Sequence, residues 1–140
     1  MAPHKHWTID HVGIAVQNLD KAIRFYEGKL GAKLCLRETI EASGVELAFI
    51  DTGDSKVELL APTTSDSKIA KFLASRGPGI HHICYEVADI RAELARLLKE
   101  GCELIDSVPR RGAAHSQIAF VAPGSFMGVL TELLEYPKGR

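Results

Sequence analysis

The pattern of hydrophobic and polar positions occurs twice along the chain, each time with the same order of predicted elements. In the first half, a β-branched apolar run at residues 9–16 predicts a buried strand. Apolar positions at helical spacing predict a helix over residues 19–30, with Asn18 as its N-cap and Gly31 at its end. Alternating segments around Ser43 and Gly44 predict a hairpin, and the strands expected from it onward span residues 33–41, 45–51 and 56–61.

The second half repeats this order. A strand is expected over residues 80–87, and Asp89 is the expected N-cap of a helix that runs to Glu100 and stops at Gly101. Further strands are expected at residues 103–105, 117–122 and 129–134. Each half therefore reads as βαβββ, and a four-stranded sheet with one helix leaves its other face free.

These patterns predict an α+β fold made of two tandem βαβββ modules, whose curved mixed sheet surrounds a common cleft. We expect a single domain over residues 1–140, at a length that buries about 68% of the unfolded surface. The first module is expected at residues 7–62 and the second at 80–137. The connector at residues 63–79 contains a short predicted helix at 67–75 and is too apolar for a disordered linker.

Two histidines and two glutamates occupy duplicated positions in these halves. His82 lies 71 residues after His11, and Glu132 lies 74 residues after Glu58, so the halves keep register within three residues. A lone strand histidine is most simply a core residue, and a lone glutamate can end up exposed at a strand edge. The duplication favours a metal site instead, because an unpaired buried carboxylate is costly and normally finds a cation, a metal or a proton.

Imidazole and carboxylate ligands together suit a divalent ion such as Co, Mn, Ni or Zn. Four such ligands at an open cleft also leave coordination positions for water or for substrate oxygens, as catalytic metals require.

The composition of the chain limits the kinds of partner and compartment that we expect for it. The net charge of −1, with 46% apolar and 25% charged residues, provides no bulk charge to attract nucleic acid or a membrane. No apolar run approaches the roughly 20 residues of a membrane span, and residues 1–6 lack the apolar core of a signal peptide. The three cysteines match no zinc or redox spacing, which predicts a reduced compartment. We expect a cytoplasmic protein, or a mitochondrial-matrix one if a transit peptide was removed from a eukaryotic source.

The chain resembles the vicinal oxygen chelate (glyoxalase-fold) superfamily and, within it, the methylmalonyl-CoA epimerases over nearly its full length. The segments that carry the resemblance are DHVGIAV at 10–16, GD at 53–54 before VELL at 57–60, SKIAKFL at 67–73, GIHHI at 79–83, PRRGA at 109–113 and GVLTEL at 128–133. The resemblance implies paired βαβββ modules, a homodimer, an acyl-CoA substrate and a metal held by His11, Glu58, His82 and Glu132.

The family's reaction removes and returns a proton at the α carbon of a 2-methylmalonyl thioester, so it interconverts R and S forms through a metal-stabilised enolate. Inversion needs a proton acceptor on one face of that carbon and a donor on the other. Glu41, just before the Gly-Val pair of the predicted hairpin, matches the family's carboxylate, with Glu38 or Glu46 as substitutes. Glu132, as a metal ligand, is the family's expected second participant.

The sequence departs from the family's usual pattern at His115 and Gly124, in loops expected to line the substrate mouth. Two other functions on the same fold therefore stay open. A glyoxalase I uses the same ligand types to move a proton in a glutathione hemithioacetal, but its usual Asp-Pro-Asp-Gly before the last strand is absent. A non-catalytic, metal-dependent small-molecule binding protein would have no use for a base at Glu41. A ring-cleaving dioxygenase needs only two His and one carboxylate, which would leave Glu58 without a role.

Overall fold

A computed structural model describes residues 7–138, which form two compact units. The first unit is His11–His81, and the second consists of the residues up to Asp10 together with those from His82 onward. The expectation that no signal peptide is present concerns residues 1–6, which lie outside the described residues. The expected domain boundaries stay a prediction.

The first unit has the βαβββ order that the sequence predicts, followed by a helix. Its elements are β1 (Thr8–Ala15, whose first residues belong to the second unit), α1 (Leu19–Leu30), β2 (Leu34–Ile40), the 3-10 turn η1 (Glu41–Ser43), β3 (Val45–Asp51), β4 (Lys56–Pro62) and α2 (Lys68–Arg76). The strand order is β2-β3-β4-β1, with β1 and β4 parallel and the other pairs antiparallel. The sheet is mixed because α1 carries the chain back across it before β2 begins.

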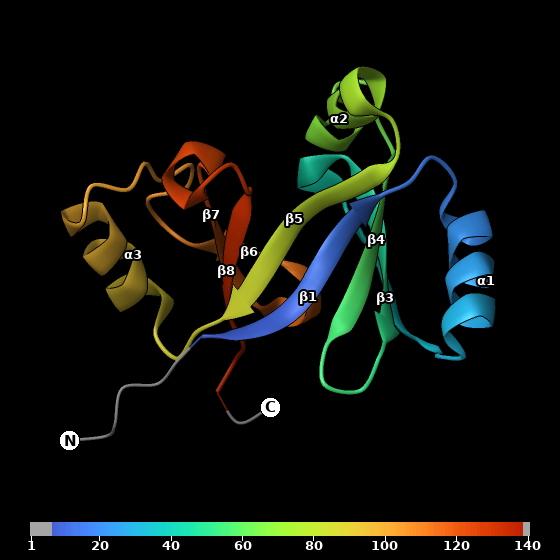
Figure 1. The fold of residues 1–140 in the computed structure, drawn as a ribbon, viewed down its shortest axis with the longest axis horizontal. Helices are drawn as coiled ribbons and strands as arrows, with labels where there is room; N and C mark the ends of the chain where they lie inside the picture. Colours follow the sequence, from blue (N-terminus) through green and yellow to red (C-terminus); the bar gives the residue numbers. More distant parts are fainter. Residues whose placement is uncertain (1–6, 139–140) are drawn as a thin grey trace. The chain divides into compact units, whose positions relative to one another are not determined.

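One face of this sheet is covered by α1 (Figure 1). The Asn18 side chain accepts a hydrogen bond from the Lys21 N–H at 2.9 Å, and Gly31 ends the helix in the left-handed conformation, as predicted. The apolar stripe of α1 then packs on alternate strand residues, and the buried cluster comprises Leu19, Ile23, Ala48, Ile50, Leu59 and Ala61.

The second unit repeats the order with a much shorter second strand. Its elements are β5 (Gly79–Glu86, which begins in the first unit), α3 (Ile90–Lys99), β6 (Arg110–Arg111), the 3-10 turns η2 (Ala113–His115) and η3 (Pro123–Phe126), β7 (Gln117–Val121) and β8 (Thr131–Glu135). The order is β5-β8-β7-β6, with β5 and β8 parallel. Helix α3 packs against β7 and β8, and its buried cluster comprises Val87, Ile90, Leu94, Leu97, Ala119, Val121 and Leu133.

The predicted strand at residues 103–105 is wrong. Leu104 forms only an isolated bridge to Val121, and the backbone N–H groups of Ile105 and Asp106 both donate to the Phe120 carbonyl, at 2.9 and 3.1 Å. Two donors on one carbonyl interrupt a ladder, so the chain pairs with β7 five residues later, at β6. The last strand also starts two residues later than predicted, at Thr131.

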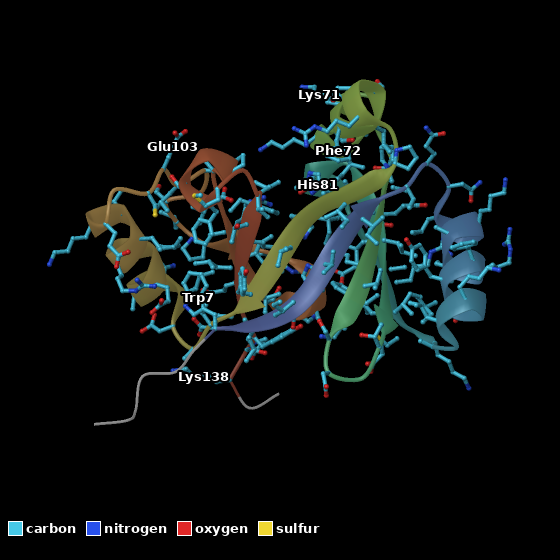
Figure 2. The ribbon with its side chains drawn as sticks, in the orientation of Figure 1. Trp7, Lys71, Phe72, His81, Glu103 and Lys138 are labelled. Carbon is cyan, nitrogen blue, oxygen red and sulfur yellow. The ribbon has the colours of Figure 1, made fainter. Side chains whose placement is uncertain are left out.

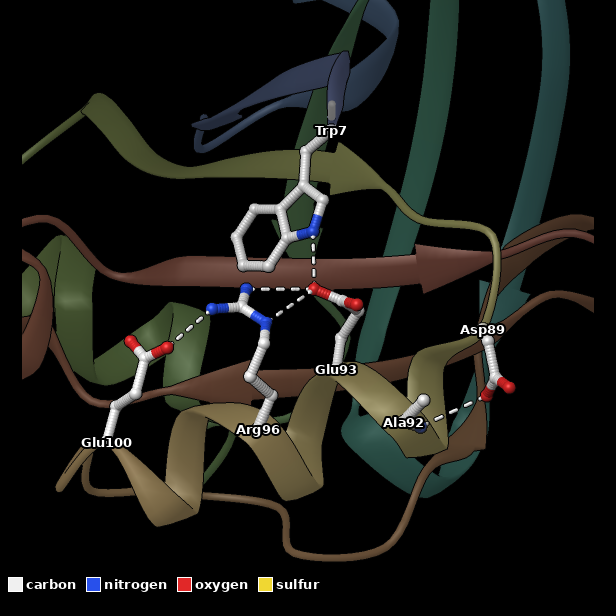
Figure 3. Close-up of polar contacts among 6 residues, drawn as sticks. All are labelled: Trp7, Asp89, Ala92, Glu93, Arg96 and Glu100. Carbon is white, nitrogen blue, oxygen red and sulfur yellow. Dashed lines mark hydrogen bonds and ion pairs between the residues drawn. The ribbon is translucent and has the colours of Figure 1, made fainter. Parts of the chain in front are cut away.

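The N-terminal end of β1 is fastened to α3 by Trp7 (Figures 2 and 3). Its indole N–H donates to Glu93 Oε1 at 2.8 Å, and its ring stacks on Phe126 with centroids 6.3 Å apart. Arg96 donates to Glu93 at 2.9 Å and to Glu100 at 2.8 Å, and the hydrogen bond to Glu93 raises the pKa of Arg96. This cluster holds Trp7 within the second unit, although Trp7 lies 86 residues before Glu93 in the sequence.

No helix between residues 7 and 138 is long and apolar enough to cross a membrane.

Gly44 gives a test of the turn that follows η1. Its φ of +65° is left-handed, and a Cβ there would lie 2.4 Å from Thr64 Oγ1. Gly44→Ala should lower the free energy of unfolding by about 2 kcal/mol or more, through backbone strain and this contact. Gly31→Ala, with the same φ but open space, should cost about 1 kcal/mol, and Gly124→Ala, with neither constraint, less than about 0.5 kcal/mol. Urea unfolding measures all three, and equal losses for Gly44 and Gly31 would show that Thr64 imposes no constraint.

Candidate metal centre

The first unit carries a buried His–Glu pair on the sheet face opposite α1. Glu58 of β4 lies across from Phe49 of β3 and from Gly13 of β1 in the strand register. His11 precedes Gly13 by two residues, so its side chain is on the same face. Its Nε2 lies 3.1 Å from Glu58 Oε1, and the two residues are only 1% and 6% exposed.

The second unit repeats this arrangement. Glu132 of β8 lies across from Phe120 of β7 and from Cys84 of β5, and His82 precedes Cys84 by two residues. The distance from His82 Nε2 to Glu132 Oε1 is 2.9 Å, with exposures of 3% and 5%. The internal repeat seen in the sequence is therefore a repeat of side-chain contacts.

A phenylalanine supports each imidazole, and sequence reasoning missed both. The ring of Phe49 meets His11 edge-on at a centroid distance of 5.1 Å, and that of Phe120 meets His82 at 5.5 Å. The signal was present in the sequence, because an Ala-Phe-apolar run containing each residue recurs at the same 71-residue offset as the histidines. Each aromatic edge restricts the rotation of its imidazole and helps to keep Nε2 directed at the carboxylate.

The chemistry of these residues fits a divalent metal ion. Each unit supplies one imidazole nitrogen and one carboxylate, and all four side chains are buried. A carboxylate withdrawn from water needs a compensating cation or proton, and borderline or hard divalent ions bind this pair of ligand types. Each pair is thus compatible with metal binding, although the ligand types do not select one metal.

The adjacent histidine, His81, points elsewhere. Successive strand residues point to opposite faces, so His81 does not share the face of His82. Its ring meets Phe72 of α2 with centroids 5.1 Å apart, and Figure 2 shows the two residues side by side. The His-His pair of the sequence therefore contains one candidate ligand and one histidine that packs against α2.

The strand register shows on which face of the sheet two of the three candidate bases of the first unit lie. Glu46 pairs with Thr39 and Ala61, which places it on the α1 face, and Arg37 approaches it at 3.9 Å. Glu38 pairs with Leu47, on the same face as Phe49 and Glu58. Glu46 is thus on the wrong face of the sheet to serve the His–Glu pair.

Glu41 is the first residue of η1, just beyond the pairing of β2 with β3, and it is exposed. Its side chain makes no hydrogen bond or ion pair with another residue in the range 7–138, and its carbonyl accepts from the Gly44 N–H at 3.1 Å. The carboxylate is therefore accessible from solvent and not committed to a structural contact.

The two departures from the family pattern lie in loops of the second unit. His115 ends η2, where Ala114 and His115 both have left-handed φ values of 54° and 59°, and its Nδ1 lies 3.3 Å from Arg111 Nη2. Gly124 lies in η3, where a Cβ would meet no atom within 4 Å. Among residues 7–138, neither residue forms a hydrogen bond, ion pair or ring contact with a His–Glu pair.

Comparisons with known proteins agree with this architecture. A family model of the glyoxalase/bleomycin resistance protein/dioxygenase superfamily matches residues 10–120. The chain is 40% identical over 127 residues to the ethylmalonyl-CoA/methylmalonyl-CoA epimerase of Cereibacter sphaeroides, which covers 89% of this chain and 95% of that protein. A variant of Streptomyces coelicolor methylmalonyl-CoA epimerase in complex with 2-nitronate-propionyl-CoA matches with a TM-score of 0.88 and 39% identity, covering 93% of this chain and 94% of that one. The lactoylglutathione lyase of Neisseria meningitidis is 27% identical over 111 residues, 79% of each chain.

The chain belongs to the glyoxalase/bleomycin resistance protein/dioxygenase superfamily. The predicted resemblance to methylmalonyl-CoA epimerases is also confirmed, at a higher identity and coverage than for the lactoylglutathione lyase. The predicted fold class and the predicted enzyme class, an isomerase of the epimerase type, are confirmed by the same comparisons.

Proposed function

We propose that this protein is a metal-dependent epimerase of methylmalonyl-CoA, or of a close 2-substituted malonyl-CoA, which interconverts the R and S forms by moving the α proton. The observation that carries the proposal is the duplicated, buried His–Glu pair in a chain 40% identical to an ethylmalonyl-CoA/methylmalonyl-CoA epimerase. Burying two carboxylates against two imidazoles has a large desolvation cost, which a reaction at a metal would explain.

His11, Glu58, His82 and Glu132 would together hold one divalent ion, with Co, Mn, Ni and Zn as the candidates. Such an ion, when bound, would stabilise negative charge on the thioester and carboxylate oxygens of the substrate by several kcal/mol. The residues of the chain then have to move the proton.

Glu41 is the proposed base. Phe49, which lies across from Glu58, is four positions further along β3 than Val45, the residue next to η1. At about 3.3 Å per strand residue this is about 13 Å, a distance compatible with a small acyl group between Glu41 and the Glu58 side chain. Accessibility and the lack of a structural contact favour Glu41 for proton transfer, and the Glu132 carboxylate would return a proton on the opposite face of the α carbon.

The ligand of the Streptomyces coelicolor protein supports this chemistry. A nitronate is planar at carbon and anionic, like the enolate that forms when an α proton leaves a malonyl thioester. A fold that binds such a group is suited to stabilise the charge of that intermediate.

The decisive experiment is deuterium exchange at C2 of methylmalonyl-CoA in D₂O, with metal-reconstituted protein. Starting from a single C2 epimer, we expect exchange together with formation of the other epimer. Turnover of a glutathione hemithioacetal without C2 exchange would replace the proposal by the glyoxalase I alternative. Binding of thioesters without either reaction would favour a non-catalytic binding protein.

The proposed ligand set predicts one divalent ion per chain. His11→Ala and His82→Ala should each lower the metal content, because each removes one imidazole from the set. Elemental analysis of dialysed protein measures this, with His81→Ala as the matched control that removes a neighbouring histidine outside the set. Undiminished metal in His82→Ala would contradict the assignment.

The proposed base predicts a selective loss of rate. Glu41→Gln should bind metal normally but epimerise about 10² to 10⁴ times more slowly, the usual cost of removing a general base. Glu46→Gln is the matched control and should keep the wild-type rate, because Glu46 lies on the α1 face. Glu132→Gln should lose both metal and rate. A wild-type rate for Glu41→Gln would transfer the role to Glu38.

We also infer a homodimer. Large apolar side chains are exposed in both units, with Phe25 at 56%, Ile80 at 65% and Met127 at 98%. Sedimentation at micromolar concentration should give about twice the 15.3 kDa chain mass, and a mass near that of one chain would contradict the inference. The cytoplasmic location stays a prediction.

A further inference from the structure

Arg110 lies on the same face of its sheet as the His82–Glu132 pair. In the strand register Arg110 of β6 pairs with Ile118 of β7, two residues before Phe120, which lies across from Glu132. Side chains two residues apart on a strand share a face, so the side chain of Arg110 emerges beside Phe120.

Asp106 holds this arginine in place. Its Oδ1 accepts from Arg110 Nε at 3.3 Å, and its Oδ2 accepts from the Phe120 backbone N–H at 2.9 Å. The backbone N–H of Asp106 in turn donates to the Phe120 carbonyl at 3.1 Å. One carboxylate therefore couples the orientation of Arg110 to the strand that carries Phe120.

The guanidinium rests over the Phe120 ring, with Cζ 5.6 Å from the ring centroid. The centroid of the same ring lies 5.5 Å from that of His82. The distance from Arg110 Cζ to the centroid of the His82 ring is therefore at most about 11 Å. The position is close enough for one small ligand to contact both the histidine region and the arginine.

The terminal nitrogens of Arg110 are available. Asp106 uses only Nε, and Nη1 and Nη2 make no hydrogen bond or ion pair elsewhere in residues 7–138. The side chain is 42% exposed. A guanidinium whose two terminal NH₂ groups are free and fixed in one plane matches the oxygens of a carboxylate or a phosphate.

We propose that Arg110 binds an anionic oxygen of the acyl-CoA substrate, with Asp106 and Phe120 as positioning residues. This inference rests on the proposed function, since an acyl-CoA of the malonyl class carries both a carboxylate and phosphates. Both groups carry negatively charged oxygens that can accept hydrogen bonds from the arginine. Arg110 determines the affinity and orientation of the substrate, whereas carboxylates transfer the proton.

The test compares steady-state kinetics of Arg110→Gln and Arg110→Lys with the wild type. Loss of a charge-assisted hydrogen bond should raise KM for methylmalonyl-CoA about 10- to 100-fold in Arg110→Gln, with a much smaller change in kcat. Arg110→Lys should recover only part of the loss, because a lysine provides a point charge in place of a planar fork. Arg91→Gln is the control, since it removes the same charge from an exposed position on α3. An unchanged KM in Arg110→Gln, or an equal rise in Arg91→Gln, would overturn the proposal.

Two further measurements identify the anionic group. If Arg110 binds a CoA phosphate, Arg110→Gln should weaken competitive inhibition by free CoA and leave turnover of the methylmalonyl thioester of N-acetylcysteamine unchanged. If it binds the acyl carboxylate, the phosphate-free thioester should lose affinity and CoA inhibition should stay the same. No effect on either measurement would count against the site.

A double-mutant cycle tests the role of Asp106. Asp106→Asn should raise KM less than Arg110→Gln does, and the double variant should be no worse than Arg110→Gln alone, because both changes act through one contact. Additive effects would overturn the positioning role. A wild-type protein that fails to exchange the C2 proton would refute the proposed function, whereas an active wild type with an unaffected Arg110→Gln would refute only this inference.

Discussion

Burial of a histidine and a glutamate on an apolar sheet face is the constraint on which the rest of this molecule depends. An unpaired carboxylate would be costly in either unit, because an isolated buried charge costs several kcal/mol, a large part of the net stability of a small domain. In each unit the imidazole lies within about 3 Å of the carboxylate, and a phenylalanine ring packs edge-on against it. The parallel pairing of the first and fourth strands creates this contact, since it places a residue from the start of each module beside one from its end.

The alternation of side chains along each strand determines which face of the sheet every other residue of the site occupies. One face of each sheet carries alanine, isoleucine, leucine and valine residues against a helix, and the other carries the His–Glu pair. The same alternation places Glu46 on the helix-covered face and Glu38 on the face of the His–Glu pair. It also directs His81 and His82 to opposite faces and places Arg110 on the same face as Phe120. A shift of one residue in any of these pairings would exchange the two faces, so fold stability and site chemistry are fixed by the same register.

The sequence predicted much of this because its signals are local or repeated. Helix caps at Asn18 and Asp89 and the stop at Gly31 depend on neighbouring residues, and they are found in the structure. The His and Glu positions followed from the repeat. The absence of the strand predicted at residues 103–105 could not be foreseen in the same way, because it depends on which of several N–H groups reaches the Phe120 carbonyl. The roles of Phe49 and Phe120 were likewise hidden, since an aromatic residue in a strand looks like any core residue until its neighbours across the sheet are known.

The two units differ at the turn that carries the proposed base. An inversion at carbon needs one proton partner on each of its two faces. The turn η1 of the first unit begins with Glu41, whereas its counterpart η2 in the second unit is Ala113–His115, within a stretch from Ser107 to Gln117 that contains no acidic residue. The proposed carboxylate for the second face is Glu132 of β8, which lies across from Phe120 in the strand register. In the proposed mechanism, the first unit therefore contributes its proton partner from a turn and the second unit from a strand.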